Sequence, residues 1–98
     1  MFDIKTVNKR YFGIKIGDTT LEVEPPKIKA LKKLTTLSKS KGEDTMENLS
    51  EAIKMILRKN KNNINVGDDL VEELDLDEMN EILTAYFEWI ANSKNSPN

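Results

Sequence analysis

Two short segments near the N-terminus alternate between apolar and polar residues, a period typical of β-strands with one buried face. Their apolar positions are Phe12, Ile14, Ile16, Leu21 and Val23. Between the segments stand Gly17 and Asp18, and glycine in the first place suits a two-residue type II′ turn. We therefore predict a hairpin over about 12–24. Its register sets Ile14 opposite Leu21, so that the apolar residues of both strands share one face.

After the hairpin, apolar residues recur every three or four positions, which is the period of amphipathic helices. The predicted helices span about 26–40, 45–59, 68–74 and 76–92. The proline pair at 25–26 ends the second strand and can open the first helix. The apolar stripe of that helix consists of Ile28, Leu31, Leu34 and Leu37. Asp44 with Glu47, and Asp75 with Glu78, have the spacing of capping boxes, so we expect each pair to start a helix.

These elements predict one α+β domain over residues 1–92, in which a small bundle of about four helices follows the hairpin. A chain of 98 residues is long enough for one modest hydrophobic core. Phe2, Ile4 and Val7 leave two possibilities for the first eleven residues, an edge strand or a loose arm. The polar segment S-K-N-S-P-N at 93–98 is expected to be a disordered tail.

The composition excludes several kinds of chemistry. The chain has no cysteine and no histidine, which removes disulfides, thiolate metal sites and imidazole-based mechanisms. It also has no serine elbow and no phosphate-binding glycine loop. No apolar run approaches the ~18 residues of a membrane span. We therefore expect no catalytic residues, no cofactor and no membrane insertion, and we interpret the chain as a non-enzymatic protein.

The acidic residues at 68–81 raise the question of a calcium or magnesium site. Counted from Asp75, an EF-hand loop would need a third acidic or amide ligand followed by glycine. Met79 and Asn80 occupy those two positions, so the motif fails. Helix capping and a solvated acidic face explain the cluster, and no metal ligand is expected.

The two halves of the chain carry opposite charges. Residues 1–42 contain ten Lys or Arg and four Asp or Glu, a net charge of +6, whereas residues 43–98 contain five and thirteen, a net charge of −8. Such a chain either neutralises itself internally or stacks the basic part of one copy on the acidic part of the next, so we expect self-association. The side chains that we assign to these charge contacts are Lys29, Lys32, Lys33, Asp68, Asp69, Glu72 and Glu73.

The last predicted helix carries a second apolar stripe beside its main one. Broad burial in the core is one interpretation of this stripe. The other is a partner-binding groove, because Trp and Tyr are frequent hot-spot residues in interfaces. Under the second interpretation the groove consists of Ile82, Ala85, Tyr86 and Trp89, extended by Met55 from an earlier helix.

The order of segments is similar to that of a known protein family. A hairpin leads into E-P-P-K-I-K-A-L-K-K-L, and an acidic stretch, D-D-L-V-E-E-L-D-L-D-E-M-N-E-I-L, runs into a final helix with A-Y-F-E-W-I. Over roughly residues 12–92 this order, in pattern and length, resembles the small tail assembly chaperones of long-tailed phages and prophages.

This resemblance implies a non-enzymatic α+β protein of the host cytoplasm that is used during assembly and is absent from the finished virion. Such proteins coat the helical tape measure protein before tail tube subunits polymerise around it. The resemblance thus implies the tape measure protein as a partner, with the tail tube protein as a possible second one. The family offers no catalytic residues to carry over.

Two other functions remain open at this point. The lysine-rich helix at 27–41 could contact phosphates in a small nucleic-acid-binding phage regulator. We do not expect nucleic acid as the partner, because no aromatic residue is interleaved with the lysines and the rest of the chain is acidic. A generic adaptor that recruits another helical protein through its apolar stripe is the second alternative.

Overall fold

The computed structural model describes residues 1–7 and 9–92. Its elements are a 3-10 turn η1 (Ile4–Thr6), the strands β1 (Phe12–Ile16) and β2 (Thr19–Val23), and the helices α1 (Ile28–Ser38), α2 (Thr45–Arg58), α3 (Asp68–Glu72) and α4 (Leu76–Ala91). The predicted α+β class is confirmed, and every helix begins and ends within two residues of its predicted bounds. The predicted disordered tail at 93–98 lies outside the described residues.

The hairpin has the predicted register. Phe12 pairs with Val23, Ile14 with Leu21 and Ile16 with Thr19. Gly17 has a φ of 59°, whereas Asp18 is not among the described residues with positive φ. A positive φ at the first turn position alone is the mark of a type II′ turn. The pairing sets Leu21 and Val23 into the core, where both side chains are fully buried.

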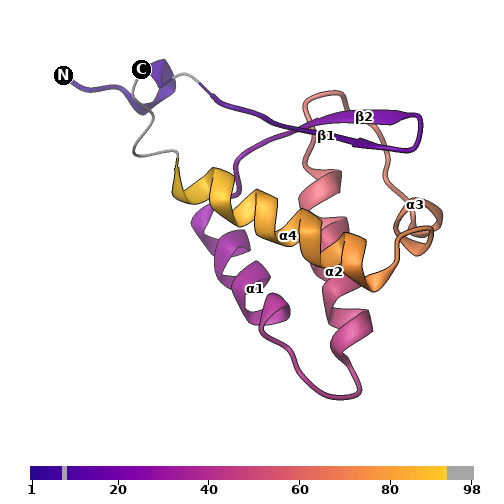
Figure 1. Cartoon of the computed structure of the whole chain (residues 1–98). Coiled ribbons are helices and arrows are strands. Elements are labelled where there is room, and N and C mark those ends of the chain that lie inside the picture. Colours follow the sequence, from indigo (N-terminus) through magenta and orange to yellow (C-terminus); the bar gives the residue numbers. More distant parts are fainter. Residues whose placement is uncertain (8, 93–98) are drawn as a thin grey trace.

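The core gathers around α2, which contacts α1, α3, α4 and β2. Figure 1 shows α1 and α3 on opposite sides of α2, with α4 packed across the helices and the hairpin lying over one end of them. The buried hydrophobic residues are Leu21, Val23, Leu34, Leu49, Ala52, Ile53, Ile56, Leu57, Val66, Val71, Met79, Leu83 and Tyr86. A helix packed on several sides buries a wide stripe, and five residues of α2 are buried.

One of the two predicted capping boxes is present. The backbone N–H of Glu78 donates to Asp75 Oδ1 at 2.7 Å, and the N–H of Asp75 donates to Glu78 Oε1 at 2.9 Å. Asp44 directly precedes the first residue of α2, so this pair also starts a helix as expected, but the capping box is absent because the Asp44 side chain makes no capping hydrogen bond. Its φ and ψ of −89° and 5° place it in a turn, not in the extended backbone of an N-cap residue.

The segment at 60–65, which lies between the second and third predicted helices, extends the hairpin. Asn60 forms an antiparallel bridge with Val23. The N–H of Lys61 donates to the carbonyl oxygen of Glu22 at 2.8 Å. This segment therefore lies along β2 as a short third partner and ties the end of α2 to the hairpin.

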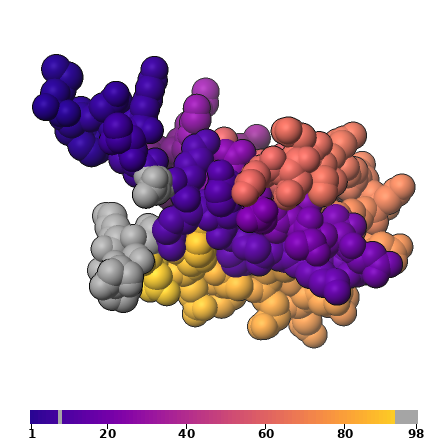
Figure 2. Space-filling view, turned by 90° about the horizontal axis from the view of Figure 1, so that it is seen from above, coloured from indigo at the N-terminus to yellow at the C-terminus, as the bar shows by residue number. Residues whose placement is uncertain are grey.

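The first seven residues form an arm that leaves the body of the protein. Figures 1 and 2 show it projecting from the hairpin side. Phe2, Ile4 and Val7 are all exposed, so none of them is part of the described core. Of the two possibilities left open by the sequence, the arm is the one observed.

Candidate functional site

An apolar hollow lies where the end of α4 meets the start of α1. Its volume is about 800 Å³. It is lined by Val7, Lys9, Arg10, Pro25, Pro26, Ile28, Leu31, Trp89, Ile90 and Ala91. The N-terminal arm, the proline pair and two helices thus meet around one concave surface.

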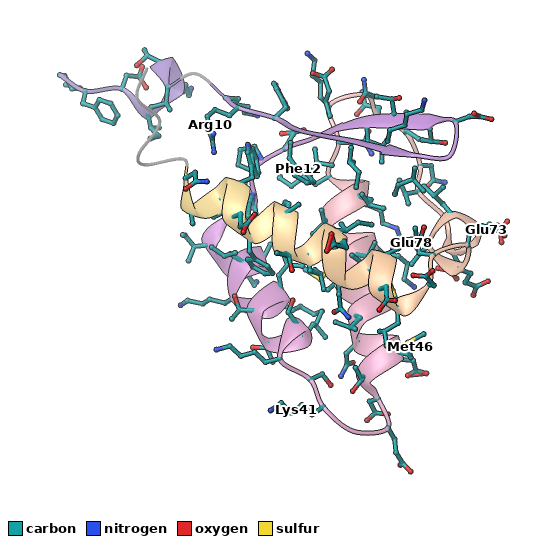
Figure 3. The ribbon with its side chains drawn as sticks, viewed as in Figure 1. Arg10, Phe12, Lys41, Met46, Glu73 and Glu78 are labelled. Atoms are coloured by element: carbon teal, nitrogen blue, oxygen red, sulfur yellow. The ribbon has the colours of Figure 1, made fainter. Side chains whose placement is uncertain are left out.

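Trp89 is held at this hollow by contacts on two sides. Arg10 Nη2 donates to the carbonyl oxygen of Trp89 at 3.0 Å, and the guanidinium carbon lies 4.9 Å from the centroid of the indole ring. This carbonyl is in the last turn of α4, where backbone acceptors have no partner within the helix. The ring centroids of Phe12 and Tyr86 lie 5.6 and 5.8 Å from that of Trp89. Figure 3 shows Arg10 and Phe12 above the C-terminal half of α4.

Ile28 supplies an exposed apolar side chain at the rim. It is the first residue of α1, directly after Lys27, which makes no side-chain capping bond. The sequence placed Ile28 in the buried stripe of this helix, but 68% of its surface is exposed, so that expectation was wrong. The first turn of α1 reaches past the edge of the core, and Leu34 is the residue of this helix that is fully buried.

The five residues predicted to form one partner groove do not line one common hollow, although the rings of Tyr86 and Trp89 are in contact. Tyr86 belongs to the core, with 1% of its surface exposed. Ile82 lines a different hollow, between α4 and the hairpin, and Ala85 is exposed between the two hollows. Met55 is partly buried against the core from α2. Of the five, Trp89 is the one that lines the hollow at α1.

Little in the sequence indicates this hollow. Ile28 and Leu31 have the spacing of core residues, and Arg10 carries no motif. Their grouping depends on the contact between Arg10 and Trp89 of α4, two residues that lie 79 positions apart in the sequence. The double proline at 25–26 was the one available signal, because it fixes the angle at which the chain enters α1.

The residues predicted for charge contacts are all at the surface. Lys29, Lys32 and Lys33 are exposed on α1. Asp68 accepts a hydrogen bond from Lys54 Nζ at 3.0 Å. That bond raises the pKa of Lys54 and lowers the pKa of Asp68. Within residues 1–7 and 9–92, no ion pair joins the lysines of α1 to the acidic residues of α3.

Tyr86 makes the stability of the fold depend on pH in alkaline solution. Burial raises the pKa of its phenol from 10.0 to about 12. Between these two values the unfolded chain has lost the proton and the folded chain has kept it, so the free energy of unfolding should fall as pH rises. We expect urea unfolding to show this loss between about pH 10 and about pH 12. Tyr86→Phe should have a smaller loss over the same interval, and an equal loss in both proteins would contradict the assignment.

The described part of the chain lacks both a metal-binding cluster and a membrane-spanning helix. No group of three or more acidic side chains there is arranged to hold a metal ion. None of the described helices combines the length and apolar character needed to cross a membrane.

Comparisons with known proteins found no match to a protein-family model, to a curated protein or to a solved structure.

Proposed function

We propose that this chain is a non-enzymatic tail assembly chaperone of a phage or prophage. It binds a helical segment of the tape measure protein in the hollow between α1 and α4. The observation that carries this proposal is the hollow itself, with exposed Ile28 on its rim and Trp89 in its wall. The order of segments described above is what directs the proposal to this family.

An amphipathic helix fits the physical character of this surface. Such helices dock their apolar face into grooves through residues spaced three or four positions apart. Ile28, Leu31 and Ile90 offer apolar contact area for that face. Lys9 and Arg10, also in the lining, can pair with acidic residues on the polar side of the helix.

In this proposal the protein acts in the cytoplasm of the bacterial host. It covers apolar faces of the tape measure protein until tail tube subunits replace it, and it is then released from the finished tail. The tail tube protein is a second possible partner at the moment of exchange. A surface that binds many similar helical segments needs few geometrically demanding contacts, and an apolar hollow meets that need.

The test is co-expression of this chain with the tape measure protein of the same phage or prophage, followed by affinity pull-down and titration. Ile28→Ser should weaken binding about tenfold or more, since one buried aliphatic side chain contributes about 1.5–3 kcal/mol. The variant should fold normally because the side chain is exposed. Met46→Ser, which removes an exposed apolar side chain on α2, is the matched control and should bind like the wild type.

Equal recovery of the tape measure protein by wild type and Ile28→Ser would move the binding surface away from this hollow. No recovery by folded wild-type protein would remove the tape measure protein as the partner. A gel shift at low salt would then test the nucleic-acid alternative, because phosphate contacts weaken steeply as salt rises.

A further inference from the structure

An acidic hollow lies between the first half of α2 and α3, away from the hollow at Trp89. Its volume is about 480 Å³. Four carboxylates and one ammonium group line it, which gives a net charge of −3: Glu47, Glu51, Asp68 and Glu72 against Lys54. Lys54 is paired with Asp68 at 3.0 Å and lies 3.7 Å from Glu51. Glu47 and Glu72 are exposed and make no ion pair with any described residue.

The lining of this hollow also has an apolar component. Met46 and Val71 contribute to it, and half of the Met46 surface is exposed. In Figure 3, Met46 lies on the same side of the molecule as Glu73, the residue that follows the end of α3. The surface can therefore bury methylene groups as well as attract positive charge.

A basic hollow lies between the start of α1 and the end of α2. Its volume is about 340 Å³, and Lys27, Lys29, Lys33 and Lys59 line it around Ala30. None of these four ammonium groups forms an ion pair with a described residue. Lysine stems are apolar and their heads are charged, so this hollow matches the acidic one in both respects.

A single copy cannot bring these two surfaces together. The acidic hollow involves the residues of α2 from Met46 to Lys54, whereas the basic hollow involves Lys59, which follows the last residue of the same helix. A helix of 14 residues is about 21 Å long. α1 and α3, which supply the remaining lysines and carboxylates, lie on opposite sides of α2 (Figure 1). The four lysines and the carboxylates of Glu47 and Glu72 are thus available to another molecule, whereas Glu51 and Asp68 are paired within the chain.

We propose that a second copy of this chain docks its basic hollow onto the acidic hollow of the first. Because different surfaces of the two copies meet, the contact is head-to-tail: the first copy keeps its basic hollow free, and the second keeps its acidic hollow free. Copies then add in the same way to form a row or a ring. This interaction goes beyond helix binding at Trp89 and uses none of the residues that line the hollow at Trp89.

Nucleic acid fits the basic hollow less well than a second copy does. The chain as a whole has a net charge of −2, and its acidic half would be repelled by phosphates. A second copy instead presents a surface of the required sign and of similar size.

Sedimentation velocity of the full chain at increasing concentration tests the proposal. In about 10 mM salt the wild type should form species larger than the monomer, and in about 1 M salt, where screening is strong, it should be monomeric. Two double variants reverse one surface each: Lys29→Glu with Lys33→Glu, and Glu51→Lys with Glu72→Lys. Each alone should remain monomeric, while an equimolar mixture should associate, because the intact surface of one meets the intact surface of the other.

A matched control separates this contact from a general effect of charge. The double variant Lys29→Glu with Lys33→Glu is called the α1 variant. Lys5→Glu with Lys15→Glu changes the net charge by the same amount but leaves the basic hollow intact, so it should associate like the wild type. A wild type that stays monomeric in low salt would overturn the proposal. Loss of association in the control to the same extent as in the α1 variant would also overturn it. Binding of short duplex DNA by the wild type, if the α1 variant abolished that binding, would overturn it as well. Pull-down of the tape measure protein by the α1 variant distinguishes failure here from failure of the proposed function.

Discussion

Replacing Asn60 with leucine is expected to lower the free energy of unfolding by about 2–4 kcal/mol. Asn60 is the one polar residue among those described whose side chain is classed as buried, with 4% of its surface exposed. Leucine has the same branched shape and the same number of heavy atoms, so the change removes hydrogen bonds without leaving a cavity. The loss should appear in urea unfolding followed by circular dichroism.

The expected size of the effect comes from three hydrogen bonds. Asn60 Nδ2 donates to the carbonyl oxygens of Leu57 at 2.8 Å and Ile64 at 2.9 Å, and Asn60 Oδ1 accepts from the N–H of Ile64 at 2.8 Å. The side chain therefore closes the last turn of α2 and fixes the loop that follows. An unpaired buried backbone group costs about 1–3 kcal/mol, and leucine would leave such groups without their partner.

Asn62→Leu is the matched control for this prediction. Asn62 Oδ1 accepts one hydrogen bond, from the N–H of Glu22 at 2.9 Å, and the residue is exposed. Water can replace that bond, so the control should lose less than about 1 kcal/mol. If the two variants lost the same stability, Asn60 would not be the residue that organises this loop.

Asn60 also marks the limit of what the sequence could predict. The run N-K-N-N-I-N identifies a loop by its composition, and the structure agrees that it contains no helix. Which of its asparagines is buried depends on the backbone reaching Val23 of β2, a contact between distant positions. The hairpin register and the bounds of the helices were predictable because they follow from periodicity and turn chemistry within short segments.

The distinction between features fixed within a short segment and contacts between distant positions also explains how much of the candidate site was predictable. The Asp75 capping box was predictable because it needs two residues three positions apart, and the matching pattern at Asp44 failed because the preceding turn fixes a different backbone angle. The sequence left open whether Trp89 packs in the core or faces a partner, and it did not indicate that Arg10 and Ile28 lie near it. Arg10 reaches it from the other end of the chain, and Ile28 reaches the rim because α1 extends past the core.

Replacing Ile53 with alanine is expected to lower the free energy of unfolding by about 2–5 kcal/mol. Ile53 lies in the middle of α2 and is fully buried. Alanine favours helix more than isoleucine does, so the helix itself would not be weakened. The loss arises from apolar surface left without contacts and from the cavity that neighbouring elements cannot fill.

Because α2 lies at the centre of the core, this loss is large relative to the total free energy of unfolding. A domain of 98 residues has a stability of about 5–15 kcal/mol, so the change could remove half of it and shift Tm by about 10 °C or more. Met46→Ala is the control on the same helix, because that side chain is half exposed, and it should cost less than about 1 kcal/mol. Differential scanning calorimetry of the two variants beside the wild type measures both shifts. A similar Tm for the two variants would mean that α2 is not the helix around which the core is built, and that α1, α3, α4 and the hairpin hold together without it.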